Sequence, residues 1–229
     1  MKNHQRAALE YFKGLIPGNV LDVATGTGAV TSELKKLGFK VVSTDLYETP
    51  QDRRGFLRAD LNAFFPFADG RFDYLLCMET LQYMENHAHF FRETARVLKP
   101  GGQAVLTTPN VLGASSRSYF FRRGYFPHFK PARFFKEGRD WDAISYNTIS
   151  LVDIYELAAR SGLAIIGVTA TRTKLKNIPM AVLLKALYAP GRLFERNERK
   201  AELIAMLSSF DALVGDNLLI SLKRTGGRG

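Results

Sequence analysis

The segment VLDVATGTGAV, residues 20–30, carries the most informative pattern in the chain. Its apolar start predicts a buried strand, and the residues after glycines 26 and 28 predict the first turn of a helix. Because glycine has no Cβ, the backbone of such a turn can approach a ligand closely, and the free N–H groups of a helix N-terminus can donate to it. We therefore expect a ligand at the turn that follows this first strand.

Strands and helices alternate along the rest of the chain. Strands are expected at residues 19–25, 40–46, 56–61, 72–79, 103–109, 163–172 and 216–224. Helices are expected at residues 4–16, 29–38, 86–102 and 151–162. The alternation predicts an α/β fold, with a Rossmann-like, seven-stranded, mostly parallel sheet and helices on both faces. We expect a single domain over residues 1–229, in which two insertions at 110–147 and 173–214, too long for ordinary connections, form a helical lid.

Composition excludes several classes of protein. The single cysteine, Cys77, lies in an apolar run and is expected to be a buried strand thiol, so the chain has no disulfide framework. The N-terminal residues lack the apolar core of a signal peptide, and no apolar run reaches the roughly 18 residues of a transmembrane helix. We therefore expect a cytoplasmic protein.

The net charge of +10 is concentrated in two segments. Residues 117–139 contain seven basic residues and one acidic residue, and residues 171–200 contain eight basic and two acidic residues, so each segment carries +6. The two segments together exceed the net charge, so the remainder of the chain is slightly acidic. An acidic group on the substrate, or an anionic surface, is the partner that such segments favour.

Two familiar ligands of glycine turns fit this chain poorly. A dinucleotide favours G-x-G-x-x-G, but Thr31 stands where the third glycine would be. A phosphate-binding P-loop is excluded, because no Gly-Lys-Ser/Thr follows the turn.

Four motifs in register indicate another ligand. The first is Asp22-Val23-Ala24-Thr25-Gly26-Thr27-Gly28, with Ala24 in place of a glycine, and the second is Asp45 at the end of the second strand. The third is RADLNAFFPFADGRFDYLLCMETLQYM, residues 58–84, and the fourth is VLKPGG, residues 97–102, before a strand. Over about residues 18–110 the chain resembles the class I S-adenosylmethionine (SAM)-dependent methyltransferases, in particular the type 11-like enzymes that act on small molecules.

The resemblance implies SAM as the cofactor, S-adenosylhomocysteine (SAH) as its product, and no metal. It implies that the glycines let the loop pass under the methionyl part of SAM, and that Asp22 orients that loop and the ammonium group. Asp45 would accept both ribose hydroxyls, and Asp60 the adenine amino group. The expected cofactor-binding residues are Asp22, Ala24, Gly26, Gly28, Asp45, Leu46, Asp60, Leu61 and Met78.

The acceptor side is less defined. The Asn/Asp-Pro-Pro-aromatic motif of nucleic-acid N-methyltransferases is absent after the fourth strand, so base methylation is not expected. Many relatives have Glu-His where this chain has Gln82-Tyr83, so no general base is obvious. Glu79, Tyr83 and His128 are the candidate catalytic residues, and transfer to oxygen is favoured over transfer to carbon or nitrogen.

The first insertion supplies candidate substrate-binding residues. The segment TPNVLGASSRSYFFRRGYF, residues 108–126, is similar to methyltransferases found with polysaccharide and lipid-linked glycan synthesis. Arg117, Arg122 and Arg123 suit a phosphate or carboxylate, and Tyr119 suits stacking on a sugar or isoprenoid, although core packing is the alternative for the aromatic residues.

In the second insertion, IPMAVLLKALY, residues 178–188, either lies in the interface of an anionic membrane or packs on the domain as a cap helix. The expected function is methyl transfer to a small-molecule, sugar or lipid-linked acceptor. The alternatives are methylation of a quinone-type molecule, a SAM-binding protein without turnover, and, less favoured, an RNA methyltransferase. The oligomeric state is not predicted.

Overall fold

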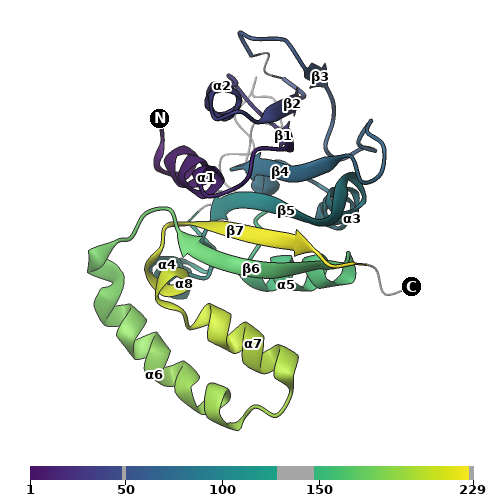
Figure 1. Ribbon diagram of the computed structural model, residues 1–229. Helices are drawn as coiled ribbons and strands as arrows, with labels where there is room; N and C mark the ends of the chain where they lie inside the picture. Colours follow the sequence, from purple (N-terminus) through teal and green to yellow (C-terminus); the bar gives the residue numbers. More distant parts are fainter. Residues whose placement is uncertain (48–49, 128–146, 227–229) are drawn as a thin grey trace.

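A twisted seven-stranded sheet forms the centre of the protein (Figure 1). The computed structural model describes residues 1–47, 50–127 and 147–226. The strands lie in the order β3-β2-β1-β4-β5-β7-β6, and only β7 runs antiparallel to its neighbours. Their bounds are β1 Asn19–Val23, β2 Lys40–Asp45, β3 Phe56–Arg58, β4 Phe72–Met78, β5 Leu98–Pro109, β6 Leu163–Ala170 and β7 Asn217–Arg224. The predicted Rossmann-like sheet is confirmed.

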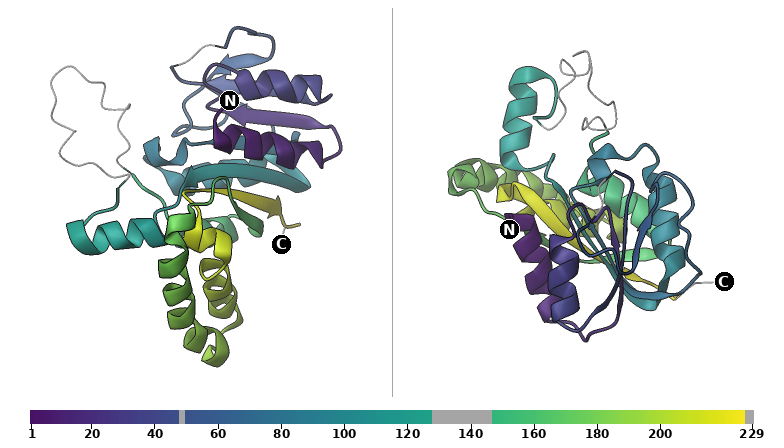
Figure 2. Two further views of the ribbon diagram at one scale, coloured as in Figure 1. Left: turned by 90° about the vertical axis from the view of Figure 1, so that its left-hand side faces the viewer. Right: turned by 90° about the horizontal axis from the view of Figure 1, so that it is seen from above.

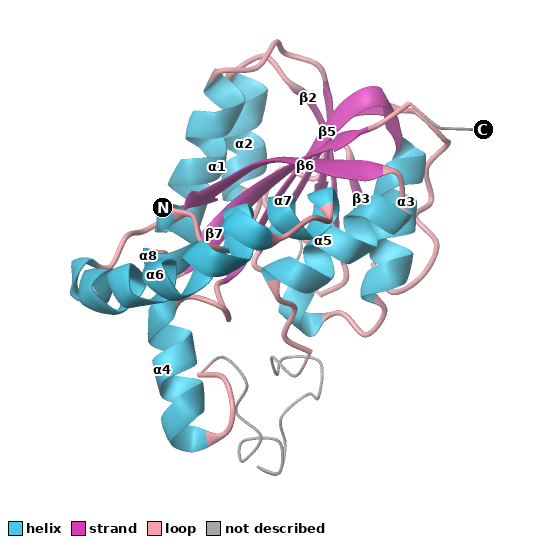
Figure 3. Ribbon diagram, turned by 90° about the horizontal axis from the view of Figure 1, so that it is seen from below, coloured by secondary structure: helices cyan, strands magenta, loops and turns pink. Residues whose placement is uncertain are grey.

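Helices cover both faces of the sheet (Figures 2 and 3). On one face, α1 and α2 bury Phe12 and Leu34 against the sheet, and on the other α3 and α5 bury Phe91 and Ile154. The helices are α1 Asn3–Lys13, α2 Ala29–Lys36, α3 His87–Val97, α4 Ala114–Arg123, α5 Leu151–Arg160, α6 Ile178–Phe194, α7 Glu198–Leu207 and α8 Phe210–Val214, with short 3-10 turns η1 Leu81–Tyr83 and η4 Leu175–Asn177.

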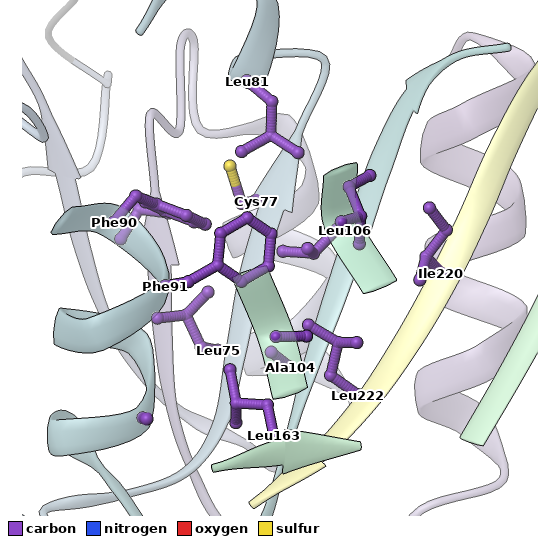
Figure 4. Close-up of a cluster of buried hydrophobic side chains, with 14 of the residues drawn as sticks. Leu75, Cys77, Leu81, Phe90, Phe91, Ala104, Leu106, Leu163, Ile220 and Leu222 are labelled. Carbon is purple, nitrogen blue, oxygen red and sulfur yellow. The ribbon is translucent and has the colours of Figure 1, made fainter. Parts of the chain in front are cut away.

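The alternation of side chains along β4 divides the core into two clusters. Leu75 and Cys77 point to the larger cluster, with Phe90 and Phe91 of α3, and Leu76 belongs to the smaller cluster under α1 and α2 (Figure 4). Cys77 is fully buried, and burial raises the pKa of its thiol, so this cysteine packs as a small apolar residue. The prediction of a buried strand thiol is confirmed.

Several predicted bounds differ from the structure by a few residues, as in α1 and β3, and the largest difference lies at the end of α3. The sequence predicts a helix over 86–102, but α3 ends at Val97, and residues 98–102 form the start of β5. Leu98 pairs with Phe72 of β4, and Gly101 adopts a φ of 79°. The Pro-Gly-Gly segment therefore bends the chain inside a strand, where it was expected to stop a helix.

Each insertion contains helices. The first holds α4, and its residues 128–146 lie outside the described residues. The second holds η4, α6, α7 and α8, and Figure 1 shows α6 and α7 extending together away from the sheet. Among the helices that the structure describes, none combines the length and the apolar character needed to cross a membrane.

Candidate active site

The candidate site lies at the carboxyl ends of the parallel strands, where the strand order reverses. β1 lies between β2 and β4, so the chain leaves β1 and β4 towards opposite sides of the sheet. Open α/β sheets bind ligands at such a switch point. The four carboxylates expected from the sequence lie near the carboxyl ends of separate strands: Asp22 is the second-last residue of β1, Asp45 is the last residue of β2, and Asp60 and Glu79 follow β3 and β4.

The glycine turn between β1 and α2 has a backbone that other residues would strain. Gly26 and Gly28 have φ angles of 56° and 76°. A Cβ on Gly28 would lie 2.7 Å from the Cβ of Pro50, so this position excludes larger residues. A Cβ on Gly26 would meet nothing within 4 Å among the described atoms, so open space adjoins the turn there.

Two non-glycine residues at strand ends also have positive φ. Ala24 follows β1 with a φ of 55°, and Glu79 follows β4 with a φ of 53°. Non-glycine residues in this region cost about 1–3 kcal/mol each, and such strain concentrates at functional sites. Both residues line one cavity, so the strained backbone adjoins the place where a ligand would bind.

Asp22 lies fully buried behind the turn. Its Oδ2 accepts hydrogen bonds from the hydroxyls of Thr25 and Thr31, whereas its Oδ1 has no hydrogen-bond partner among the described residues. Burial raises the pKa of Asp22 to about 6, although the two hydroxyls partly oppose this effect. A carboxylate with an unsatisfied oxygen is suited to attract a cation.

Asp45 ties the second strand to the turn. Its Oδ2 accepts from the N–H of Gly26 at 2.9 Å, and its Oδ1 accepts from the N–H of Tyr47 at 3.0 Å. Asp45 also lines the adjoining cavity, so its carboxylate lies where a ligand's donors would meet it.

The cavity at the switch point has a volume of about 270 Å³. It is lined by Ala24, Asp45, Leu46, Tyr47, Ala59, Asp60, Leu61, Asn62, Glu79, Thr80, Tyr83, Met84 and Glu85. Five of the nine expected cofactor-binding residues are among them. Asp22, Gly26, Gly28 and Met78 do not line the cavity: Asp22 is buried behind the turn that Gly26 and Gly28 shape, and Met78 ends β4.

A larger hollow of about 640 Å³ lies at the other edge of the sheet, next to Asn19 and Lys40 at the starts of β1 and β2. None of the expected cofactor-binding residues lines it. The chemistry of the lining therefore identifies the site better than its volume does.

The candidate catalytic residues differ in their placement. Glu79 and Tyr83 line the cavity, and Oε1 of Glu79 is buried without a hydrogen-bond partner among the described residues. Gln82, which stands where relatives have an acidic residue, points elsewhere, because its Nε2 donates to the carbonyl of Glu79. His128 lies outside the described residues.

The candidate substrate-binding residues lie on α4, and none of them lines the cavity. Arg117 makes contacts within the protein. Its Nε donates to the Leu112 carbonyl, and its guanidinium lies 5.3 Å from the ring centre of Tyr188 on α6. The hydroxyl of Tyr119 donates to that of Tyr125. Arg122 and Arg123 are exposed at the end of α4, so they remain accessible to a ligand.

The structure adds His4, which the sequence did not indicate. α1 runs against the strand direction, because Tyr11 near its end donates to Gln103 at the start of the sheet-forming part of β5, and Phe12 packs on Tyr74 at 5.7 Å. From Phe12 to His4 the helix rises about 12 Å towards the carboxyl edge of the sheet. His4 and Glu79 interact electrostatically there.

Burial lowers the pKa of His4, and the neighbouring carboxylate of Glu79 opposes that effect only in part. His4 is therefore a neutral imidazole near neutral pH, able to accept a proton. The sequence missed six of the cavity residues, each within two positions of an expected site residue, so a wider window around each strand end would have included them: Tyr47, Ala59, Asn62, Thr80, Met84 and Glu85.

Known proteins are similar to this chain in sequence and in fold. A family model described as a methyltransferase domain matches residues 21–106. A demethylmenaquinone methyltransferase of Tropheryma whipplei (strain Twist) is 31% identical over 166 residues, which cover 67% of each chain. The chain belongs to the SAM-dependent methyltransferase family. All the motif residues of this methyltransferase, from Asp22 to Glu79, fall inside the matched region.

Other relatives cover less of the methyltransferase. A ubiquinone biosynthesis O-methyltransferase of Sodalis glossinidius is 28% identical over 113 residues, or 44% of this chain and 45% of the relative. The chain thus spans about half the length of several curated relatives that it matches. A solved SAM-dependent methyltransferase from Mesorhizobium loti has the same fold, with a TM-score of 0.58 at 21% identity over 96% of this chain and 98% of the other.

SAM is the cofactor of this family, and the site fits its polar groups. The unpartnered Oδ1 of Asp22 suits a cationic group, and the open space beside Gly26 leaves room for a chain to pass over the turn. Asp45 and Asp60 both line the cavity and bring carboxylate acceptors to it. Ribose hydroxyls and an adenine amino group are donors, so acceptors are the groups that the cofactor requires.

Proposed function

We propose that this methyltransferase transfers the methyl group of SAM to an oxygen atom of a small-molecule, sugar or lipid-linked acceptor and releases SAH. The observation that carries the proposal is the single cavity that gathers Asp45, Asp60 and Glu79 from separate strand ends. Two of these carboxylates have a place on the cofactor, and the third is left for the acceptor. The printed name of the Sodalis relative, an O-methyltransferase, supports oxygen as the methylated atom.

The chain's contribution is mainly alignment. Bound SAM supplies an electrophilic methyl group on a sulfonium, and the protein has to hold an acceptor in line with it. Gly26 and Gly28 shape the turn under the methionyl part, Asp22 holds the ammonium, Asp45 accepts from the ribose hydroxyls, and Asp60 with the N–H of Leu61 recognises adenine. Such alignment can supply roughly 7–11 kcal/mol of the lowering of the barrier.

A hydroxyl acceptor must also lose its proton. As the oxygen–carbon bond forms and the carbon–sulfur bond breaks, the proton of the hydroxyl passes to Oε1 of Glu79, which lines the cavity and has no hydrogen-bond partner among the described residues. His4 interacts electrostatically with this carboxylate from outside the cavity lining.

Replacing Glu79 by glutamine is expected to lower kcat by roughly 10²–10⁴-fold, because an amide cannot take the proton. The dissociation constant for SAM is expected to stay the same. Glu85→Gln, at another lining residue, is the matched control and should keep its activity. Activity assays with SAH release as the signal, together with calorimetry, separate the two effects. Equal activity of the Glu79 variant and the wild type would remove Glu79 from the proposed role.

The insertions supply the acceptor specificity in this proposal. We assign the domain to residues 1–229, and we propose that the described parts of the insertions at 110–147 and 173–214 take part in binding the acceptor. Arg122 and Arg123 suit a phosphate or carboxylate on the acceptor. A basic surface of this kind would also let the protein associate with the inner face of the cytoplasmic membrane and methylate a lipid-linked acceptor there.

Replacing Arg122 and Arg123 together by alanine is expected to raise KM for an acidic acceptor at least tenfold, because hydrogen bonds to charged groups are worth about 1.5–3 kcal/mol. SAM affinity is expected to be unchanged. Arg160→Ala, an exposed arginine on α5, is the control for loss of positive charge. Steady-state kinetics and a SAM titration test the prediction. A loss of SAM affinity would contradict the acceptor role of these arginines.

The relatives favour a second acceptor, a quinone-type ring. The two curated relatives described above are named for ubiquinone biosynthesis and for demethylmenaquinone. A ring acceptor can take the methyl group on oxygen or on carbon. Incubation with ¹³C-methyl-labelled SAM and NMR of the product distinguishes a methoxy carbon from a carbon-bound methyl.

The first experiment is a calorimetric titration with SAM and SAH, followed by SAH-release assays on a panel of sugar, lipid-linked and quinone acceptors. Micromolar binding and turnover of one acceptor class support the proposal. Binding with no turnover of any class favours a SAM-binding protein without catalysis, and binding of neither nucleoside contradicts the cofactor assignment.

A further inference from the structure

α6 carries a stripe of exposed apolar side chains on one side. Met180, Leu183, Leu187 and Phe194 are spaced by three, four and seven residues, so they lie on one face of the helix. Their exposed fractions are 40%, 54%, 68% and 80%. We call these four residues the α6 stripe.

A different face of α6 holds the helix to the protein. Ala181 is buried with Leu213 and Val214 of α8, and Leu184 and Tyr188 pack against this cluster. The docking of α6 is therefore complete without the α6 stripe. The described protein leaves the stripe in water, and it leaves Val182 and Leu193 on another side of α6 exposed as well.

The α6 stripe belongs to a wider exposed apolar region. Leu175 before the helix is 73% exposed, and Phe121 on α4 is 91% exposed. α4 and α6 contact each other through Arg117 and Tyr188, and Figure 2 shows the two helices leaving the same corner of the molecule. Single exposed apolar residues are ordinary, but a group of this kind on neighbouring helices marks a surface that binds something.

The segment that contains the α6 stripe is rich in basic residues, which favours an anionic partner. α6 contains no acidic residue, and residues 171–200 carry eight basic and two acidic residues. Lys176 before α6, Arg196 and Lys200 after it, and Arg122 and Arg123 on α4 are exposed. Lys185 is exposed too, but it is two residues from both Leu183 and Leu187 and so lies on a different face of α6. Apolar side chains that enter a bilayer interface, next to cations that meet anionic headgroups, are the composition of interfacial helices.

We infer that the α6 stripe binds the surface of an anionic lipid bilayer, with α6 in the interface and the neighbouring lysines and arginines on the headgroups. α4, which carries Arg122 and Arg123, then lies beside the same surface. This inference does not rest on the methylated acceptor, because a bilayer recognises the stripe whether or not the site turns over.

Flotation of the full chain with vesicles tests the inference. Vesicles of phosphatidylcholine with phosphatidylglycerol are compared with vesicles of phosphatidylcholine alone. We expect binding to the anionic vesicles, weakened as salt rises, and little binding to the neutral ones, because headgroup attraction is screened by salt.

Replacing both Leu183 and Leu187 by serine removes apolar surface without changing the charge. The vesicle partition coefficient is expected to fall at least tenfold, since each leucine side chain contributes apolar area to the interface. Ile16→Ser with Leu57→Ser, two exposed positions far from α6 in the sequence, is the matched control and should bind as the wild type does. SAM calorimetry on the same variants reports the integrity of the fold and of the cofactor site.

Three results would overturn the inference. Wild-type protein that fails to float with anionic vesicles at low salt contradicts it, and so does equal binding to neutral vesicles. A wild-type dimer in size-exclusion chromatography that the Leu183/Leu187 variant turns into a monomer would assign the stripe to a second copy of the chain. A failed SAM titration with intact vesicle binding would instead overturn only the proposed function.

Discussion

Replacing Asp45 by alanine should raise the dissociation constant for SAM about a hundredfold or more while the chain remains folded. In the proposed pose the ionised carboxylate accepts both ribose hydroxyls, and hydrogen bonds to charged groups are worth about 1.5–3 kcal/mol each. The substitution also removes the acceptor for the Gly26 N–H, which lies 2.9 Å from Oδ2. The turn under the cofactor would therefore lose one of the hydrogen bonds that hold it in place.

Calorimetric titration with SAM and SAH measures this effect, and a thermal unfolding curve reports whether the variant is folded. Asp52→Ala is the matched control, because Asp52 is also an acidic residue that follows β2 but pairs with Lys35 and Arg54 outside the 270 Å³ cavity. We expect the control to bind both nucleosides normally. An Asp45→Ala variant that keeps wild-type SAM affinity would refute the placement of the ribose.

The fold was largely predictable because its central strands are mostly buried. β1, β4 and β5 each contain an apolar run that is buried, and such runs between amphipathic helices indicate a parallel sheet covered on both faces. The boundary between α3 and β5 was not predictable in the same way. Proline and glycine at residues 100–102 are typical of a helix end, and only the pairing of Leu98 with Phe72 assigns the preceding residues to the strand.

The site residues that are positioned by their own strands were predictable from the sequence. Those positioned by packing between distant segments were not. Ala24 directly follows β1 and Asp45 is the last residue of β2, so their approach at one edge follows from the parallel sheet alone. His4 reaches Glu79 only through the orientation of α1, which depends on packing of Phe12 and Tyr74. The contact of Arg117 with Tyr188 likewise joins two insertions whose mutual packing no local pattern encodes.

Replacing Asp22 by asparagine should flatten the dependence of stability on pH. Burial raises the pKa of Asp22 from 3.8 to about 6. The folded state therefore holds this proton more tightly than the unfolded state does, so unfolding releases it between about pH 4 and 6. In that window the free energy of unfolding falls as the pH rises, and above it an ionised, buried Asp22 costs about 3 kcal/mol, since each pKa unit is worth about 1.4 kcal/mol.

Urea unfolding of both proteins without ligand, at several pH values from 4 to 8, measures this effect. The difference in unfolding free energy, variant minus wild type, should rise by about 3 kcal/mol across the window and then stay constant. The asparagine side chain changes the unfolding free energy by an amount that does not depend on pH, so only the change of the difference with pH reports the ionisation of Asp22. Asp52→Asn should show no such rise, because hydrogen bonds from Arg54 and Lys35 hold the pKa of Asp52 below its usual value. If the difference in unfolding free energy between Asp22→Asn and the wild type did not change with pH, ionisation of Asp22 would not destabilise the fold.

Cofactor binding completes the argument about Asp22. The ammonium of SAM is placed beside the unpartnered Oδ1, so bound SAM should relieve part of the cost of the ionised carboxylate. SAM should therefore bind the wild type more tightly as the pH rises through 6, and this rise should be absent in Asp22→Asn. If the pH dependence of SAM affinity were equal in both proteins, the ammonium would lie elsewhere. Asp22 would then serve only to hold the turn, by accepting hydrogen bonds from Thr25 and Thr31.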